Sequence, residues 1–142
     1  MRRARREGEG VKALTLTQPW ASLVALGFKR VETRSWRTSY RGPLAIHAAK
    51  SFPASARQFA AEERAIGRLP GRIPRGAIIC TVELIDCRPA QDVALEVSGL
   101  ERHLGDFAWG RWAWLFAPDS LRVLEEPIAS RGALGLWETA AL

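Results

Sequence analysis

Residues 18–50, QPWASLVALGFKRVETRSWRTSYRGPLAIHAAK, are the most informative part of the chain. Its pattern predicts a helix, a strand, a loop and a second strand, in that order. The stretch mixes aromatic rings with lysine, arginine and glutamate, whereas a core segment would be richer in aliphatic residues and a disordered tail would lack the rings. Charged side chains and flat rings on ordered elements indicate a surface that holds a ligand.

The helix is predicted to begin directly after residues 17–18, which supply its cap. Trp20, Leu23 and Val24 recur at helical spacing, so they should face the core. Gly27 follows the last periodic residue and is expected to end the helix in the left-handed backbone region that glycine tolerates.

The rest of the chain predicts helices and strands in a mixed order. Strands are expected over residues 12–17, 31–36, 44–48, 77–87, 112–117 and 121–124, with a last one near the C-terminal end. A helix is expected over residues 55–66, with Phe59, Glu63 and Ile66 on one face, and one short helix within residues 91–104. Because strands and helices do not alternate strictly, the order favours an α+β fold: a mixed β-barrel, closed or half-closed, with flanking helices.

Length and composition place the chain among single-domain globular proteins. Its 142 residues are 47% hydrophobic and 25% charged, and no apolar run reaches the length of a membrane span. The sequence also shows no signal peptide, so we expect a cytoplasmic protein, with a monomer favoured. Cys80 and Cys87 lie on one predicted strand and should be small buried side chains. We expect no cofactor, and no cluster of residues has the spacing of a metal site.

The chain is basic, with a formal net charge of +6. Residues 1–10, MRRARREGEG, lack periodicity and are expected to be a basic disordered tail, while residues 11–142 form the domain. Two alternatives stay open for the tail: translation starts at Val11 and the tail is not made, or the tail is an arm that grips phosphates. A basic domain favours polyanions such as nucleic acid.

The candidate contact residues begin just after Gly27. Lys29 is expected to point into a cleft at the helix end, where it acts as a base if desolvated or holds a phosphate if hydrated. Glu32 and Arg34 lie two residues apart on one face of a strand. They either form an ion pair with each other, or Glu32 orients its basic neighbours or accepts hydrogen bonds from a base edge.

Aromatic and basic side chains continue the candidate surface. Trp36 is either a core residue or a stacking platform, and Tyr40 and Arg41 add a second ring and a forked donor for phosphate. His47 alternates away from the apolar side of its strand and is either structural or, with Lys50, part of the cleft.

Further along the chain, Asp106 and Arg111 flank an aromatic run. They are expected to line the same groove as the residues around Lys29.

The residues from Gly27 to Arg34 match the pattern GxKxxExR, and the chain resembles the ASCH domain family, a branch of the PUA-like superfold. Five further blocks resemble the small stand-alone ASCH proteins of prokaryotes: residues 18–21, 40–42, 46–50, 110–114 and 132–137. The resemblance covers nearly the whole chain. It implies a PUA-like barrel with a cleft beside the signature.

The resemblance also implies a class of ligand. PUA-like domains commonly bind RNA, and ASCH proteins engage nucleic acid or nucleosides. The leading hypothesis is therefore a module that binds RNA or single-stranded nucleic acid. The alternatives are a hydrolase of RNA or acetylcytidine, with Lys29, Glu32 and His47 in its active site, and a non-enzymatic sensor of a nucleoside. In the amidohydrolase type a threonine stands where this chain has Glu32.

Overall fold

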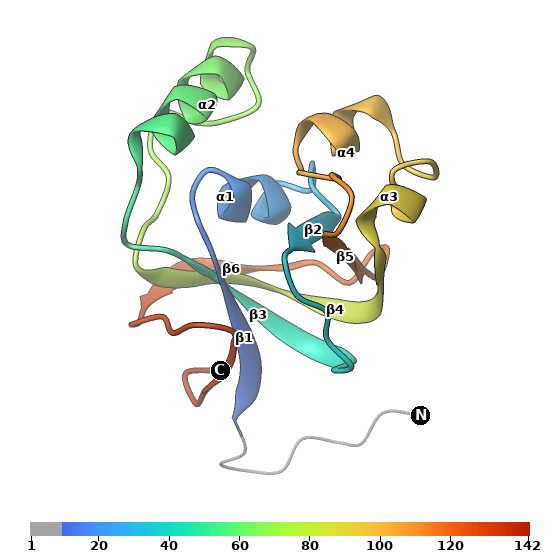
Figure 1. The fold of residues 1–142 in the computed structure, drawn as a ribbon. Helices are drawn as coiled ribbons and strands as arrows, with labels where there is room; N and C mark the ends of the chain where they lie inside the picture. The colour runs from blue at the N-terminus through green and yellow to red at the C-terminus, as the bar shows by residue number, and fades with distance from the viewer. Residues whose placement is uncertain (1–9) are drawn as a thin grey trace.

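The computed structural model describes residues 10–142, so the expectations for residues 1–9 lie outside the described part of the chain. The elements in chain order are β1 (Val11–Leu16), α1 (Trp20–Ala25), β2 (Val31–Arg34), β3 (Gly42–Ala48), α2 (Ala54–Ala65), β4 (Ala77–Pro89), α3 (Ala90–Val93), α4 (Gly99–His103), β5 (Trp112–Phe116), β6 (Arg122–Ala129) and β7 (Leu136–Thr139). Figure 1 shows helices α1, α2 and α4 on one side of the strands. The α+β class predicted from the sequence is confirmed.

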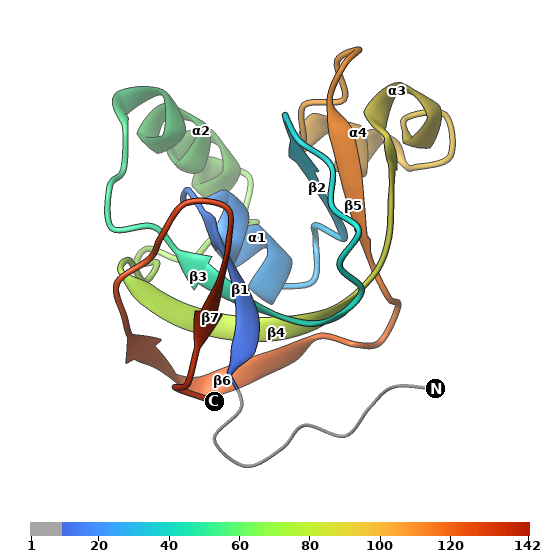
Figure 2. The same cartoon turned by 60° about the horizontal axis from the view of Figure 1, so that its bottom comes forward.

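All seven strands belong to one mixed sheet. The strand order is β2-β5-β4-β3-β1-β7, and β6 pairs separately with β4. Strands β1 and β3 are parallel, while the other pairs are antiparallel. The sheet curls around the long strand β4 (Figure 2), and it stays open because β2 and β7 each pair with a single neighbour within residues 10–142. The barrel is therefore half-closed.

The inner strands are buried on both faces. Leu14 of β1 and Ile46 of β3 pack with Trp114 of β5 in the largest core cluster, and all three are fully buried. The opposite face carries Ala13 and Ala45, which pack in a second cluster against β6 and β7. Curling places β6 and β7 over this second face, which explains why β3 and β4 are apolar on both sides.

Helix α1 is tied to the loop before β4 through Gln18. This side chain is fully buried; its oxygen accepts from the Ser22 amide at 2.9 Å and its nitrogen donates to the Pro74 carbonyl at 2.6 Å. The N-cap is Pro19, one residue later than the sequence predicted, and Gln18 satisfies a first-turn amide from the position before it. The helix ends at Ala25, and Gly27 adopts φ +85°, as its place after the periodic run predicted.

Three sequence expectations need correction. The single helix expected in residues 91–104 is two short helices, α3 and α4, with a turn between them. Ile66 does not continue the helix face of Phe59 and Glu63 and is 61% exposed, because α2 ends one residue earlier and Ile66 is its C-cap. Strand β6 extends to Ala129, since it runs along β4 as far as Ala77.

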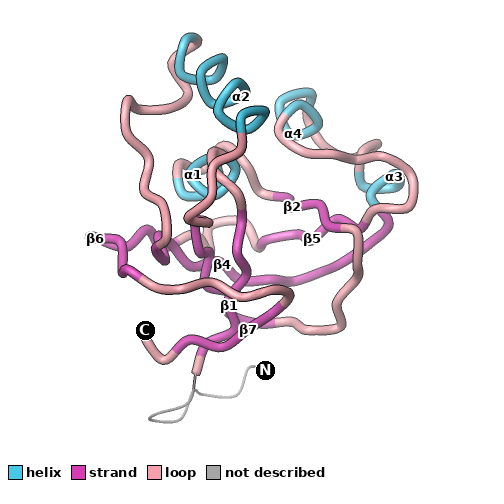
Figure 3. Tube along the Cα trace, turned by 60° about the vertical axis from the view of Figure 1, so that its left-hand side comes forward, coloured by secondary structure: helices cyan, strands magenta, loops and turns pink. Residues whose placement is uncertain are grey.

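The two cysteines differ in burial. Cys80 and Cys87 are free thiols on β4; Cys80 is buried as expected, whereas Cys87, near the end of the strand, is only half-buried. Burial raises the pKa of the Cys80 thiol to about 12. In the described chain, no group of His, Cys, Asp and Glu side chains is arranged to hold a metal ion. The helices of residues 10–142 are too short or too polar to cross a membrane. Figure 3 shows how short these helices are beside the strands.

The backbone at Gly27 generates a stability prediction. We expect Gly27→Ala to lower the free energy of unfolding by about 1–2 kcal/mol, because an L-residue is strained at a positive φ. A Cβ at Gly27 would meet no atom within 4 Å, so backbone conformation alone sets the cost. Gly71→Ala is the matched control, since Gly71 is equally open and has no such φ. Urea unfolding of both variants checks this; equal stabilities would contradict it.

Candidate nucleic-acid interface

A cleft of about 670 Å³ opens beside the signature, and we call it the signature cleft. It lies where β2 and the loop after α4 face helices α1 and α2. Its lining residues are Thr17, Trp20, Lys29, Glu32, Thr33, Arg34, Ser35, Trp36, Pro53, Ser55, Ala56, Phe59, His103, Leu104, Gly105, Asp106 and Arg111. Four of the residues predicted to bind a ligand, Lys29, Glu32, Arg34 and Trp36, come together there.

Lys29 is the most buried charge of the cleft. Its side chain is fully buried, and its ammonium donates to the carbonyls of Val31 at 2.6 Å and Leu104 at 3.1 Å. The third neighbour is the Glu32 carboxylate, with Oε1 3.5 Å from Nζ. All three neighbours are acceptors, so the three N–H groups of an ammonium are all directed within the protein. Lys29 thereby joins β2 to the end of α4.

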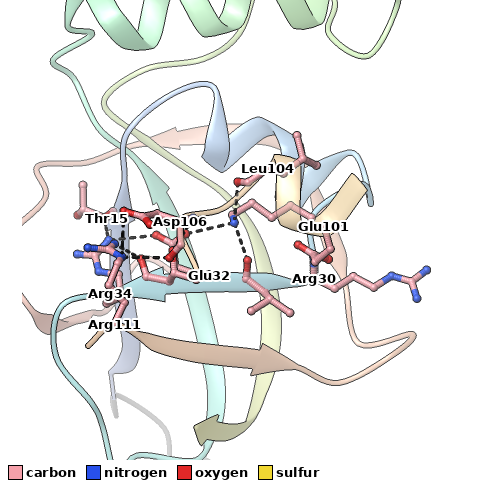
Figure 4. Close-up of polar contacts among 11 residues, drawn as sticks. Thr15, Arg30, Glu32, Arg34, Glu101, Leu104, Asp106 and Arg111 are labelled. Atoms are coloured by element: carbon pink, nitrogen blue, oxygen red, sulfur yellow. Dashed lines mark hydrogen bonds and ion pairs between the residues drawn. The ribbon is translucent and has the colours of Figure 1, made fainter. Parts of the chain in front are cut away.

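Glu32 stands between two cations. While Oε1 faces Lys29, Oε2 accepts from Arg34 Nη1 at 3.2 Å, and the same Nη1 donates to the Thr15 carbonyl at 3.3 Å (Figure 4). The Glu32–Arg34 ion pair that the strand spacing predicted is therefore present. The Glu32 side chain retains 11% of its exposure, which leaves an oriented, acceptor-only group at the cleft wall.

A second arginine holds the loop after α4 against β2. Arg111 donates to the Thr33 carbonyl at 3.0 Å and to the Asp106 carbonyl at 3.1 Å. The Asp106 amide in turn donates to the Thr33 hydroxyl at 3.1 Å. Asp106 and Arg111 both line the cleft, as expected from the sequence, and their backbone contacts give this wall a defined position.

Three rings in contact form another part of the lining, which we call the aromatic wall. Trp20 and Phe59 lie 5.3 Å apart with their planes 22° from parallel, and Phe59 and His103 lie 5.4 Å apart at 34°. All three rings line the cleft. The sequence pattern assigned Trp20 to the core and placed Phe59 on one face of its helix with Glu63 and Ile66, and nothing in the pattern singled out His103. Ring neighbours from α1, α2 and α4 meet only in the tertiary structure.

A buried carboxylate fixes His103 in this wall. Glu63 of α2 is 1% exposed and accepts from Arg68 Nε at 2.7 Å and from His103 Nε2 at 3.1 Å. The hydrogen bond from Arg68, assisted by that from His103, lowers the pKa of Glu63 against the opposing effect of burial. Glu63 thus ties α2 to α4 across the end of the cleft.

Trp36 belongs to both the core and the cleft. Its ring packs edge-on against Trp114, with centroids 4.8 Å apart at 88°, and the Arg34 guanidinium lies 5.9 Å from the Trp36 centroid. It is half-buried and lines the cleft. One edge of Trp36 therefore belongs to the core, and another part of the ring lines the cleft.

Tyr40 and Arg41 lie outside the lining of the signature cleft. The Tyr40 hydroxyl donates to the Pro43 carbonyl at 2.5 Å, and burial raises the pKa of Tyr40. Arg41 donates to the carbonyls of Thr38 and Tyr40 and lies 3.7 Å from Asp86. These contacts stabilise the connection between β2 and β3.

His47 and Lys50 line a different cavity, of about 650 Å³, at the end of β3. His47 is 2% exposed and uses both ring nitrogens internally, at 3.1 Å from the Thr15 hydroxyl and 2.8 Å from the Ser130 carbonyl. The structure therefore divides the predicted surface in two, and His47 does not share a cleft with Lys29 and Glu32.

A further carboxylate behind the signature was not anticipated. Glu101 of α4 is 6% exposed and accepts from the Arg30 amide at 2.9 Å. Burial raises the pKa of Glu101, although the Arg30 amide and the Lys29 charge oppose this effect. Glu101 and Lys29 thus both connect α4 to the start of β2.

Sequence comparison identifies the family of the chain. The chain belongs to the ASCH domain family, which it matches over residues 14–106, and its half-closed mixed sheet with flanking helices is the PUA-like fold. It is also similar to proteins named Activating signal cointegrator 1, from Homo sapiens and from Mus musculus, each 41% identical over 87 residues. The similar part is 56% of this chain and 15% of each of those relatives.

The buried ammonium generates a stability prediction. We expect Lys29→Met to lower the free energy of unfolding by about 3–5 kcal/mol, because Glu32 and two carbonyls lose their donor inside the protein. Lys12→Met is the matched control: Lys12 pairs with Glu138 at 3.0 Å, but their side chains are 37% and 64% exposed. That variant should cost less than about 1 kcal/mol. Similar losses for both variants in urea unfolding would contradict a structural role for Lys29.

The Glu63 network predicts a pH dependence. Because the folded-state pKa of Glu63 lies below its ordinary value of 4.5, its stabilising effect is present above that value and is lost as the pH falls through the folded pKa. Glu63→Gln should therefore lose less stability than the wild type on acidification below about pH 4.5. The raised pKa of Glu101 acts in the opposite direction but equally in both proteins. Identical acid profiles in urea unfolding would exclude this contribution.

Proposed function

We propose that the signature cleft binds a nucleobase of RNA or of another single-stranded nucleic acid. One observation carries the proposal: an oriented carboxylate and arginine line the same cleft as three aromatic rings in contact with one another. A nucleobase has a flat face that stacks and an edge that exchanges hydrogen bonds, so it matches both walls. The volume of about 670 Å³ is in the usual range for a small-ligand site.

The aromatic wall supports stacking of a base. Base–aromatic stacking contributes about 1–3 kcal/mol per base and does not depend on base identity. The wall keeps its shape because Glu63 holds His103 and the rings of Trp20 and Phe59 support each other. A ring fixed in this way loses little conformational freedom when a base stacks on it.

The opposite wall supports recognition of the base edge. Glu32 offers acceptor oxygens only, and these suit the amino and imino N–H groups of bases. Its neighbour Arg34 keeps donor groups beyond the one bonded to Glu32 and Thr15, and these suit a phosphate or a base carbonyl. Lys29 orients Glu32 and does not contact phosphate in this proposal, since its ammonium is enclosed by acceptors.

The contacts of Lys29 and His47 favour a binding function over the hydrolase alternative. A general base needs a free lone pair, whereas the Lys29 nitrogen is surrounded by three acceptors. His47 lines the other cavity, where both its nitrogens are engaged. The basic net charge of +6 supports a polyanionic ligand.

The proposal predicts that RNA affinity depends on side chains that line the signature cleft and not on Arg41, which lies outside it. We expect Arg34→Gln and Phe59→Leu each to weaken binding of a fluorescein-labelled RNA of about 12 nucleotides by roughly tenfold, through loss of an edge contact and of the middle ring that supports the aromatic wall. Fluorescence anisotropy measures the affinities. Arg41→Gln removes the same charge outside the cleft, so it should have little effect.

The same samples test the competing functions. Gel analysis of the RNA after incubation scores cleavage, and chromatography of acetylcytidine scores hydrolysis. If the wild type turns over either substrate and a folded Lys29→Met variant does not, the protein is a hydrolase and the binding proposal is wrong. If Arg41→Gln weakens binding as much as Arg34→Gln, the signature cleft is not the binding site.

A further inference from the structure

The second cavity lies where three chain segments meet at one end of the sheet. Residues 49–51 follow β3, residues 75–76 precede β4, and residues 130–132 follow β6. Backbone hydrogen bonds join them: the Gly76 amide donates to the Ala48 carbonyl at 2.8 Å, and the Ser130 amide donates to the Gly76 carbonyl at 3.0 Å. Antiparallel pairing of β4 with both β3 and β6 brings these ends together. We call this cavity the β3-end cleft.

Each of the three segments contributes one cation to the β3-end cleft. These are Lys50, Arg75 and Arg131, all exposed, and the lining that the structure describes contains no Asp or Glu. None of the three forms an ion pair with another of the described residues, although Arg75 lies 5.8 Å from the Phe52 ring centroid. Three cations around a concave surface without a carboxylate concentrate positive potential and favour an anion.

A buried network holds the wall that carries Arg131. The Ser130 carbonyl can only accept, so His47 Nε2 carries the proton of their 2.8 Å hydrogen bond. In the neutral ring Nδ1 then accepts from the Thr15 hydroxyl at 3.1 Å, and that oxygen receives the Trp137 indole N–H at 3.1 Å. His47 is thus a positioning residue.

Glycine 132 allows the loop to lie against this network. A Cβ at Gly132 would come within 2.6 Å of Thr15 Oγ1 and 2.8 Å of His47 Cε1. Because Gly132 has no side chain, the loop backbone can pack directly against Thr15 and His47, and this packing holds the loop next to the three cations.

The two clefts are lined by neighbouring residues at and just after the end of β1. Thr15 lines the β3-end cleft and Thr17 lines the signature cleft, two residues further along the chain. A rise of about 3.3 Å per residue separates them by roughly 7 Å along the strand direction. Arg34 of the signature cleft also donates to the Thr15 carbonyl, so the clefts are neighbours across β1.

We propose that the β3-end cleft binds a backbone phosphodiester of the same strand whose base occupies the signature cleft. This inference rests on the proposed function and adds a second contact point to it. Arginine matches phosphate oxygens with a forked pair of donors, while lysine adds a compact charge. Residues 130–132 lie beyond the part of the chain that matches the ASCH family, so Arg131 is assigned from the geometry of this chain alone.

The test is the salt dependence of RNA binding by a variant with Lys50→Gln, Arg75→Gln and Arg131→Gln. Affinity for the labelled RNA of about 12 nucleotides is measured by anisotropy across a range of salt concentrations. Each lost phosphate contact lowers the slope of log affinity against log salt by about 0.7 for a single strand. Because the cleft is proposed to hold one phosphodiester, we expect the slope to become shallower by about 0.7 and the affinity at low salt to fall at least tenfold.

The matched control removes the same charge elsewhere. Arg57, Arg72 and Arg122 are exposed, line neither cleft and form no ion pair within residues 10–142. Their triple glutamine variant should bind RNA with nearly the wild-type slope. Equal effects of the two triple variants would overturn the inference, because the β3-end cations would then act only through net charge.

Further measurements distinguish a failure of this inference from a failure of the proposed function. Phe59→Leu should weaken binding while keeping the slope. If Phe59→Leu weakens binding but the β3-end variant behaves as its control does, the phosphodiester site fails and the proposed function stands. If the β3-end variant weakens binding but Phe59→Leu does not, no base is bound in the signature cleft, and both the proposed function and this inference fail. Competition by inorganic phosphate or pyrophosphate at micromolar concentration would identify a free anion as ligand and overturn the phosphodiester assignment.

Discussion

The buried ammonium of Lys29 is the interaction on which the rest of the structure depends. A charge that is fully buried is tolerated only when acceptors surround it, and here they come from Val31, from Leu104 and from the Glu32 carboxylate. These three partners belong to β2 and to the end of α4, so the same contact that satisfies the charge sets the distance between the strand and the helix. It also turns Glu32 toward Arg34. The signature residues are therefore first a structural unit and, through that unit, a wall of the cleft.

A second buried charge acts in a comparable way on the other side of the cleft. Glu63 joins α2 to α4 through Arg68 and His103, and it holds the His103 ring against Phe59. The cleft thus lies between two walls, each built on a buried ion with several hydrogen bonds. Such walls change little on binding, which suits a site that recognises a flat base by stacking and by its edge.

The position of the cations explains how one domain could hold both a base and its backbone. The signature cleft contains carboxylates together with its arginines, while the β3-end cleft is lined by cations that lack carboxylate neighbours among the described residues. The first arrangement gives direction to hydrogen bonds, and the second gives mainly attraction for negative charge. Thr15, between them, contacts Arg34 through its carbonyl and His47 through its hydroxyl.

Local features could be predicted from the sequence alone: the helix that Gly27 terminates, the strand that carries Glu32 and Arg34 on one face, the central strand β4 and the α+β class. These follow from backbone preferences and apolar periodicity, which act over a few residues. Only the tertiary structure decided that Phe59 and His103 join the signature cleft, that Tyr40 and Arg41 stay outside it, and that His47 and Lys50 belong to a separate one. The reason is physical: the curl of the sheet and the pairing of β3, β4 and β6 set distances between residues far apart in the chain, and no local pattern records them.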